Sequence, residues 1–359
     1  MMKEFLHIVA FCCWVALLAG CDAKPLSLRD EGKPRKVYLN IAIALSDVSR
    51  TGTRVDDAAP LNDNERMQTL RIVVVRPDGT VEENRFIALY EAVERYGTET
   101  FEVVGSETKR IYLFVNERAE IVSGDAAAVL RRRALAYDLS SIVAGGRFPA
   151  AELAALTIGL KPSERFAGLL PMCESHEVAV GDTDYECSLF VTRAAVKFTF
   201  RITNRGQRAV NLTGLAIEKS AFEEFYLPHN AFYEDRVSPG GTRYKEIVSY
   251  DVPSTEAVDY YTYGAESGLA VELPVGQTVE LDPIYQLEGK YRDPQGDARN
   301  YALRMWIDGA QLDSYFPALA QLPRNTHVVV NVAVNDTRID WEVDLLPYTE
   351  KYLDPSFGL

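Results

Sequence analysis

The sequence has few cysteines and histidines and no surplus of basic residues. Five of its 359 residues are cysteine, four are histidine, and the formal net charge at pH 7 is −14. Phosphate binding needs a basic surface, so this charge argues against nucleic acid as a partner. The cysteines and histidines beyond the first 21 residues show no metal-ligand spacing, and we therefore expect neither a metal nor a cofactor.

The sequence contains one long hydrophobic run, at its start. Residues 5–18 are almost unbroken apolar sequence, too short to span a bilayer comfortably but typical of an export signal. Leu18, Ala19 and Gly20 precede Cys21 in the pattern of a bacterial lipobox. This pattern predicts cleavage after residue 20 and acylation of Cys21, whose lipid would hold the protein at the outer membrane. An ordinary signal peptide with a chance cysteine is the alternative.

No second apolar run approaches the ~18 residues of a membrane-spanning helix, so we expect the remainder of the chain to lie outside the cytoplasm. Residues 21–36 are polar and are predicted to form a tether. Cys173 and Cys187 are the cysteines left after the leader, and in an oxidising compartment they are the pair available for a disulfide.

No convergent set of catalytic residues is visible. Ser175, His176 and Glu177 are consecutive, and adjacent residues on a strand point to opposite faces, so these three cannot form a triad. With no other nucleophile, base and oxyanion donor in a recognisable pattern, we do not expect an enzyme.

The first stretch after the tether predicts a strand with one strongly apolar face, over residues 37–45. Its large apolar residues occupy alternate positions, the period of a half-buried strand: Val37, Leu39, Ile41, Ile43 and Leu45. A loop follows over residues 46–64, rich in Ser, Thr, Gly, Asp and Asn, which is long enough to be functional. Arg50 and Arg54 lie in it, where we expect them to be accessible to a protease.

Short β-type runs dominate the remainder of the chain. We predict strands over 70–75, 195–202, 210–217, 244–252, 278–281, 301–307, 328–334 and 339–345, and hairpins that join 101–104 to 110–115 and 176–180 to 185–191. Helices are predicted over 126–137 and 150–157. The last strand alternates in the same way as the first, with four residues on one face: Ile339, Trp341, Val343 and Leu345.

Many short strands predict a mainly β fold with two β-sandwich domains in tandem and a few short helices in the N-terminal domain. We place the domains at residues 37–175 and 176–359. Residues 259–264, with three tyrosines, are the best candidate for a recognition surface, because tyrosine presents a large area at low entropic cost. A partly buried strand is the alternative interpretation of that segment.

The chain resembles the fimbrillins of Bacteroidales, the subunits of type V pili. The resemblance is carried by short segments spread over most of the chain. These are the lipobox, the strand leading into Gly52-Thr53-Arg54, and residues 70–79, 101–104, 109–116, 170–172, 193–197 and 322–327. Their order and spacing together identify the family.

The resemblance implies a lipoprotein precursor with two transthyretin-like β-sandwich domains. In polymerising members an arginine-specific surface protease cuts the loop after the first strand. Loss of that strand opens a groove, which a C-terminal segment of the next subunit fills. Here the cut would fall after Arg54 or, second in preference, after Arg50, and the strand over 37–45 would be removed.

The implied partners are other fimbrial subunits, of the same or a different kind, and a ligand on a host or bacterial surface. The chain departs from the shaft pattern at its end, where proline interrupts residues 347–359 and weakens them as a donor strand. Shaft, tip and anchor roles therefore stay open. The alternative function is a glycan-binding surface lipoprotein that does not polymerise.

Overall fold

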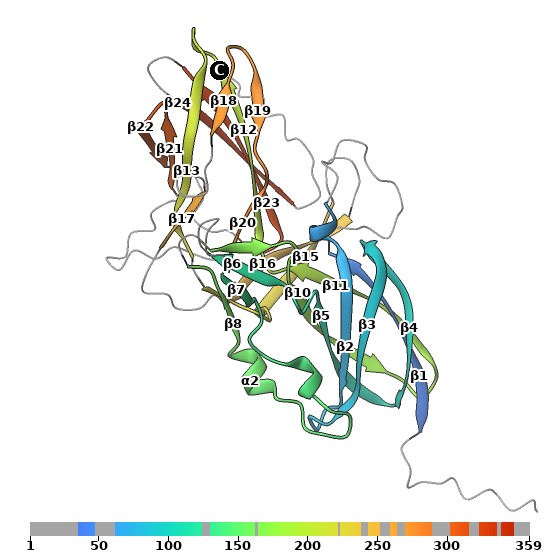
Figure 1. The fold of residues 1–359 in the computed structure, drawn as a ribbon. Coiled ribbons are helices and arrows are strands. Elements are labelled where there is room, and N and C mark those ends of the chain that lie inside the picture. The colour runs from blue at the N-terminus through green and yellow to red at the C-terminus, as the bar shows by residue number, and fades with distance from the viewer. Residues whose placement is uncertain are drawn as a thin grey trace, which may run out of the picture.

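The computed structural model describes residues 35–46, 62–123, 130–161, 164–221, 223–237, 243–251, 259–263, 270–288, 302–315, 323–335 and 339–347. Strands dominate this part of the chain and form two β-sandwiches, the lower and upper halves of Figure 1, which confirms the mainly β class. The helical elements described lie in the N-terminal half, as expected: η1 (Asp63–Glu65), η2 (Leu139–Ser141) and α2 (Ala150–Ala154).

The N-terminal sandwich is built from seven strands in the order β3-β2-β5-β10-β11-β1-β4. One layer contains β4, β1 and β11, and the other contains β3, β2, β5 and β10. The layers meet where Met172 and Cys173 pair with Arg193 and Thr192. The strand bounds are β1 Lys36–Leu45, β2 Met67–Val75, β3 Val81–Val93, β4 Arg95–Val104, β5 Glu107–Val115, β10 Met172–Val180 and β11 Tyr185–Arg193.

Alternating apolar residues from both layers fill the space between them, and β1 contributes five of these core side chains. The opposite side of the second layer is also covered, by a second apolar cluster that includes Tyr112, Phe114 and residues from the 119–170 segment. A β-strand buried on both faces loses its polar alternation, which explains why β2 and β5 are so uniformly apolar. The 119–170 segment, which packs on this side of the layer, contains four short strands: β6 Glu120–Ser123, β7 Leu130–Arg133, β8 Thr157–Gly159 and β9 Arg165–Ala167.

The C-terminal sandwich has two sheets with one apolar core between them. The first has the order β19-β12-β23-β24, with β20 also on β12, and the second the order β17-β13-β21-β22, with β18 also on β13. Their bounds are β12 Val196–Asn204, β13 Val210–Ser220, β17 Asp259–Tyr263, β18 Val271–Leu273, β19 Thr278–Glu280, β20 Ile284–Gln286, β21 Ala302–Ile307, β22 Ala310–Tyr315, β23 Thr326–Val334 and β24 Ile339–Pro347.

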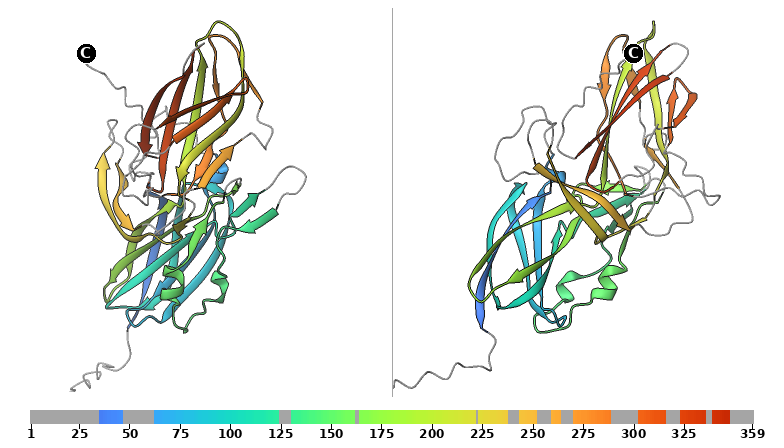
Figure 2. Two further views of the ribbon diagram at one scale, coloured as in Figure 1. Left: turned by 90° about the vertical axis from the view of Figure 1, so that its left-hand side faces the viewer. Right: turned by 180° about the vertical axis from the view of Figure 1, so that it is seen from behind.

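Three further strands lie near the junction of the sandwiches. Strand β14 (Glu223–Phe225) pairs with β8, so a C-terminal segment adds to an N-terminal one. Strands β15 (His229–Val237) and β16 (Arg243–Asp251) form a two-stranded ribbon, which Figure 2 shows beside the junction. The two sandwiches are therefore linked by backbone pairing as well as by the chain itself.

Several local predictions were wrong. Strands β4 and β5 do not form a hairpin, because β4 pairs with β1 in one layer and β5 with β2 and β10 in the other. Strands β10 and β11 pair at only two positions, and residues 185–191 pair instead with β1. The β4–β5 and β10–β11 turns therefore each cross from one layer to the other. They do so because the strands of both layers bury their apolar faces in the same core.

The helix predicted over 126–137 is also corrected. Residues 130–133 form β7, which is tied to its neighbours by ion pairs from Arg131 to Glu120 and from Arg132 to Glu164. The domain boundary shifts as well: β10 and β11 complete the N-terminal sandwich, so the division falls after Arg193 and not between residues 175 and 176. The helix over 150–157 is present in a shorter form, as α2.

Candidate functional site

The first strand, β1, lies in the middle of its layer with a neighbour on each side. It runs antiparallel to β4, from the Lys36–Val104 pair to the Ala44–Arg95 pair. It runs parallel to β11, where Leu39 to Leu45 pair with Tyr185 to Val191. Both backbone edges of β1 are thus occupied, and its removal would leave the facing edges of β4 and β11 unpaired across a gap one strand wide.

The predicted apolar face of β1 is the buried one. Val37, Leu39, Ile41, Ile43 and Leu45 are each at most 4% exposed, whereas Tyr38 on the other face is 54% exposed. Fully burying such side chains contributes about 1.5–3 kcal/mol each. Because these five side chains sit between the two layers, the gap left by β1 would be lined by five adjacent apolar pockets.

The end of β1 is tied to the C-terminal sandwich by a cluster of polar side chains, buried or half-buried, that no sequence pattern indicated. The Asn325 amide donates to Ser46 Oγ at 2.7 Å, and the Arg193 guanidinium donates to Asn325 Oδ1 at 2.9 Å. Arg193 also donates to the Glu65 carbonyl at 2.8 Å. Ser46 is the last residue described before the segment that carries Arg50 and Arg54.

The far end of that segment is tied to the same junction. Asn62 donates to Tyr285 Oη at 2.9 Å, and the fully buried Glu65 carboxylate forms an ion pair with Lys197 at 3.0 Å. Burial and the Glu65 carboxylate raise the pKa of Tyr285 well above its usual range. Residues 47–61, with the predicted cleavage sites, lie outside the described residues, but both flanks are anchored on the C-terminal sandwich.

Several segments that carried the family resemblance meet around these contacts. Asn116 is fully buried, accepts from the Gln68 and Thr69 amides, and donates to the Arg66 and Leu170 carbonyls. It therefore joins β2, β5 and the chain before β10, and its φ of 54° is the left-handed conformation that asparagine tolerates. No local sequence pattern could have assigned this role to it.

A second buried cluster lies where β10, β14 and the chain before β23 meet. Arg324 donates to Glu288 Oε1 at 2.8 Å and to the Tyr226 carbonyl at 3.1 Å. Glu224 accepts from the Glu288 amide and is fully buried, with one carboxylate oxygen unpartnered. Burial raises the pKa of Glu224 against the opposing effect of the Arg324 guanidinium, and the neighbouring Glu288 carboxylate raises it further.

Glu174, next to this cluster, is buried with hydroxyl partners in place of a cation. Tyr233 Oη donates to it at 2.5 Å and Thr192 Oγ1 at 3.2 Å. Burial raises the pKa of Glu174 to about 7. His327 is buried on β23, and its pKa falls to about 3 because of burial and the nearby Lys197 and Arg201.

The candidate donor strand is β24, the last strand of its sheet. Its backbone pairs with β23 over nine positions, from Ile339–Val334 to Pro347–Thr326. The side chains of Ile339, Trp341, Val343 and Leu345 lie outside the described residues, as do those of the tyrosine segment, whose backbone forms β17. Cys21, the predicted lipidation site, also lies outside them.

Cys173 and Cys187 are free thiols in the structure. Cys173 pairs in register with Thr192 and donates to the Tyr226 carbonyl, within the cluster on the outer side of its layer. Cys187 pairs with Ile41 and packs against the inner core. The two thiols therefore belong to different clusters, and the disulfide considered from the sequence is not formed.

The described part of the chain offers neither a metal-binding cluster nor a membrane-spanning helix. Among the described residues, no group of three or more histidine, cysteine, aspartate or glutamate side chains could hold a metal ion. None of the described helices has the length and apolar character needed to cross a bilayer.

The fold is similar to that of solved bacterial proteins described as cell adhesion proteins. A candidate cell adhesion protein from Parabacteroides distasonis has a similar structure, with a TM-score of 0.51, 14% sequence identity and coverage of 87% of this chain and 97% of its own. This likeness establishes the fold alone.

Two proteins from Porphyromonas gingivalis have lower scores. The tip fimbrial protein Mfa3 has a TM-score of 0.49 at 12% identity, over 86% of this chain and 99% of its own. The fimbrilin FimA has a TM-score of 0.47 at 13% identity, over 88% and 98%. No protein-family model matches the sequence, and no significant match was found among curated proteins.

Proposed function

We propose that this chain is a structural subunit of a cell-surface fimbrium that serves adhesion. It is made as an outer-membrane lipoprotein precursor, held by lipid on Cys21. An arginine-specific surface protease cuts after Arg54, or after Arg50, and β1 leaves. A strand from another subunit, of the same or a different kind, then fills the gap between β4 and β11.

The observation that carries this proposal is the position of β1. It is covered on both backbone edges and buried along one whole face, yet it is the first described strand and is joined to β2 through a segment with two arginines. Strand addition uses both features, because main-chain bonds give affinity and alternate pockets fix register. A strand that vacates such a gap leaves a site specific for another alternating strand.

The structure bears on which strand could be donated. Strand β24 is fully paired with β23, so its donation would break nine register positions within its own sheet. The proposal therefore assigns β24 to the closed C-terminal sandwich and leaves donation to residues that follow it or to another subunit. This favours a tip or anchor role over a shaft role.

Limited digestion of the exported chain with an arginine-specific protease tests the proposal. We expect one stable large fragment that begins at Val55, and oligomers that form only after the cut. Arg54→Ala should move the cut to Arg50, and Arg54→Ala with Arg50→Ala should stop both cleavage and assembly. Arg131→Ala, on β7, is the matched control and should be processed normally; degradation without a stable fragment would refute the precursor mechanism.

A further inference from the structure

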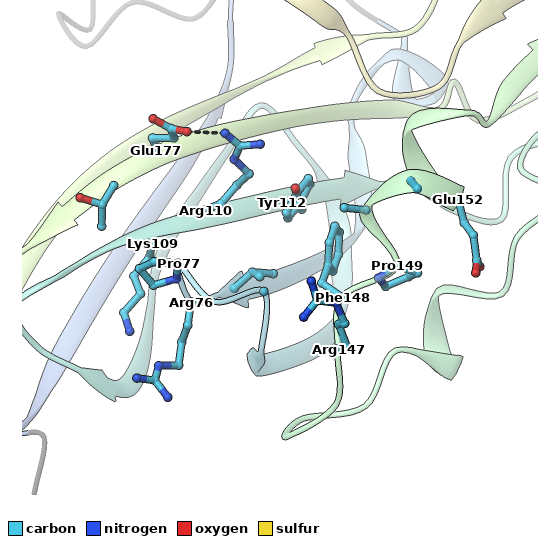
Figure 3. Close-up of a pocket in the computed structure, with 15 residues that line it drawn as sticks. Arg76, Pro77, Lys109, Arg110, Tyr112, Arg147, Phe148, Pro149, Glu152 and Glu177 are labelled. Carbon is cyan, nitrogen blue, oxygen red and sulfur yellow. Dashed lines mark hydrogen bonds and ion pairs between the residues drawn. The ribbon is translucent and has the colours of Figure 1, made fainter.

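A pocket of about 860 Å³ lies on the outer side of the β2-β5-β10 layer, away from the gap that β1 fills (Figure 3). It is bounded by the end of β2, the turn at residues 76–79, the first half of β5, the segment 147–149 with α2, and Glu177 of β10. Its volume is in the range of small-molecule sites. The assembly mechanism does not use it.

The walls of the pocket are formed in advance by backbone hydrogen bonds. Phe148 donates to the Gly79 carbonyl and Val81 to the Gly146 carbonyl, both at 2.8 Å. Gly79 has a φ of +85°, which only a turn glycine adopts without strain. The turn after β2 and the segment before α2 are therefore fixed to each other, and a ligand would meet a shaped site.

The base of the pocket is apolar and the rim is polar. Tyr112 and Phe148 stack with ring centroids 4.1 Å apart and are largely buried, so only their edges reach the pocket, and Pro77 and Pro149 also line it. At the rim, Arg110 and Glu177 form an exposed ion pair that spans β5 and β10 (Figure 3). Such a surface offers apolar contact to the C–H groups of a sugar ring, and both donors and acceptors to its hydroxyls.

The cations of the pocket differ in whether they already have a carboxylate partner. Lys109 pairs with Glu82 and Glu107 at 2.6 and 2.7 Å, and Arg76 pairs with Glu107 at 2.6 Å. Arg147 instead makes a long, 3.5 Å hydrogen bond to the Asp78 carbonyl, and it forms no ion pair with any carboxylate in the described part of the chain.

The protein has a net charge of −14, yet Arg147 at the pocket rim has no carboxylate partner among the described residues. Its guanidinium is therefore available to bind a carboxylate group of a ligand. Glu152 and Glu177 also line the pocket and would repel a ligand with many negative charges. The charge pattern therefore fits a single carboxylate on an otherwise uncharged, hydroxyl-rich molecule.

We infer that this pocket binds a saccharide that carries a carboxylate, with Arg147 as the partner of that group. Arg110 and Glu177 bind its hydroxyls, and the two prolines with the exposed edges of Tyr112 and Phe148 contact its ring. This assigns a ligand class to the adhesive role and so rests on the proposed function. Sialic acid and uronic acid share the required chemistry.

The test is calorimetric titration of the full exported chain with 3′-sialyllactose and with trigalacturonate, with lactose as the neutral reference. We expect at least one acid saccharide to bind about tenfold or more tightly than lactose. Arg147→Met should lower that affinity about tenfold, and Arg147→Lys should restore part of it. Arg131→Met, an exposed arginine outside the pocket, is the matched control.

The two saccharide arms distinguish a sialylated ligand from a uronic acid polymer. Binding of neither acid, equal binding of acid and lactose, or binding that Arg147→Met leaves unchanged would each overturn the inference. A thermal melt establishes that the variant is folded, as expected for an exposed side chain. Because cleavage at Arg54 and assembly are measured separately, a failure here is distinct from a failure of the fimbrial proposal.

Discussion

At the scale of single residues, the junction between the sandwiches contains buried and half-buried polar side chains that hydrogen-bond to one another. Ser46, Asn325 and Arg193 form one chain of hydrogen bonds, and Glu65 pairs with Lys197. The sequence predicted the buried face of β1 residue by residue, because a period of two is a local signal. It could not predict these polar pairs, since their members are more than 120 residues apart.

Glu174 gives a pH prediction at this scale. Its pKa is raised to about 7 in the folded protein by burial, above the usual value of 4.5. Its contribution to stability is therefore fully present below about pH 4.5 and is lost as the pH rises through about 7. Glu174→Gln should flatten the fall in melting temperature between pH 5 and pH 8 and make the protein relatively more stable at the upper end.

Calorimetric melts of the wild type and of Glu174→Gln across that range provide the measurement. Glu177→Gln is the control, because this neighbouring carboxylate is exposed and lies on the other face of β10. If the two variants show the same pH dependence, burial of Glu174 is not the cause.

At the scale of elements, most strand positions followed from the sequence and most pairings did not. The alternating runs that became β12, β13, β21, β23 and β24 were located to within a few residues. Both predicted hairpins failed, because layer choice depends on which core a strand's apolar face can reach. The helix expected over 126–137 failed because Arg131 and Arg132 find carboxylates across a strand pair, an effect invisible to helix periodicity.

Strand β1 should behave as a separable element after cleavage. A synthetic peptide of residues 36–46 is expected to bind the cleaved protein, because it restores both backbone ladders and fills the five pockets. Replacing Leu39, Ile41 and Ile43 with serine in the peptide should weaken binding by about a hundredfold or more, since buried apolar side chains contribute about 1.5–3 kcal/mol each.

Fluorescence anisotropy of a labelled peptide measures this affinity. The matched control replaces Tyr38 with serine, on the exposed face, and should bind almost as well as the native peptide. If the peptide with serine at the core positions and the peptide with serine at position 38 bind equally well, the vacated gap does not discriminate between side chains.

At the scale of the whole molecule, the two sandwiches are joined by β8–β14 pairing and by the buried Glu65–Lys197 ion pair. Lys197→Met leaves the Glu65 carboxylate buried without its cation, and such broken pairs typically cost about 3–5 kcal/mol in unfolding free energy. Adding Glu65→Gln should recover part of that loss. Urea denaturation provides the measurement.

Arg208→Met is the control for this experiment. It removes an exposed ion pair with Asp308, and such pairs contribute about 0–1 kcal/mol. A Lys197→Met variant that is no less stable than Arg208→Met would show that the junction pair does not hold the sandwiches together.

The orientation of β1 also has a mechanical consequence. The start of β1 lies at the end of the N-terminal sandwich far from the C-terminal one (Figure 1), and Ser46, which follows the strand, is hydrogen-bonded to Asn325 at the junction. A pull on the chain before Lys36 therefore acts along the strand, while the hydrogen bonds to β4 and β11 run across it. All of these bonds share the load in shear and must fail nearly together. Traction at the N-terminus is thus resisted by the same strand that a single peptide-bond cleavage would free.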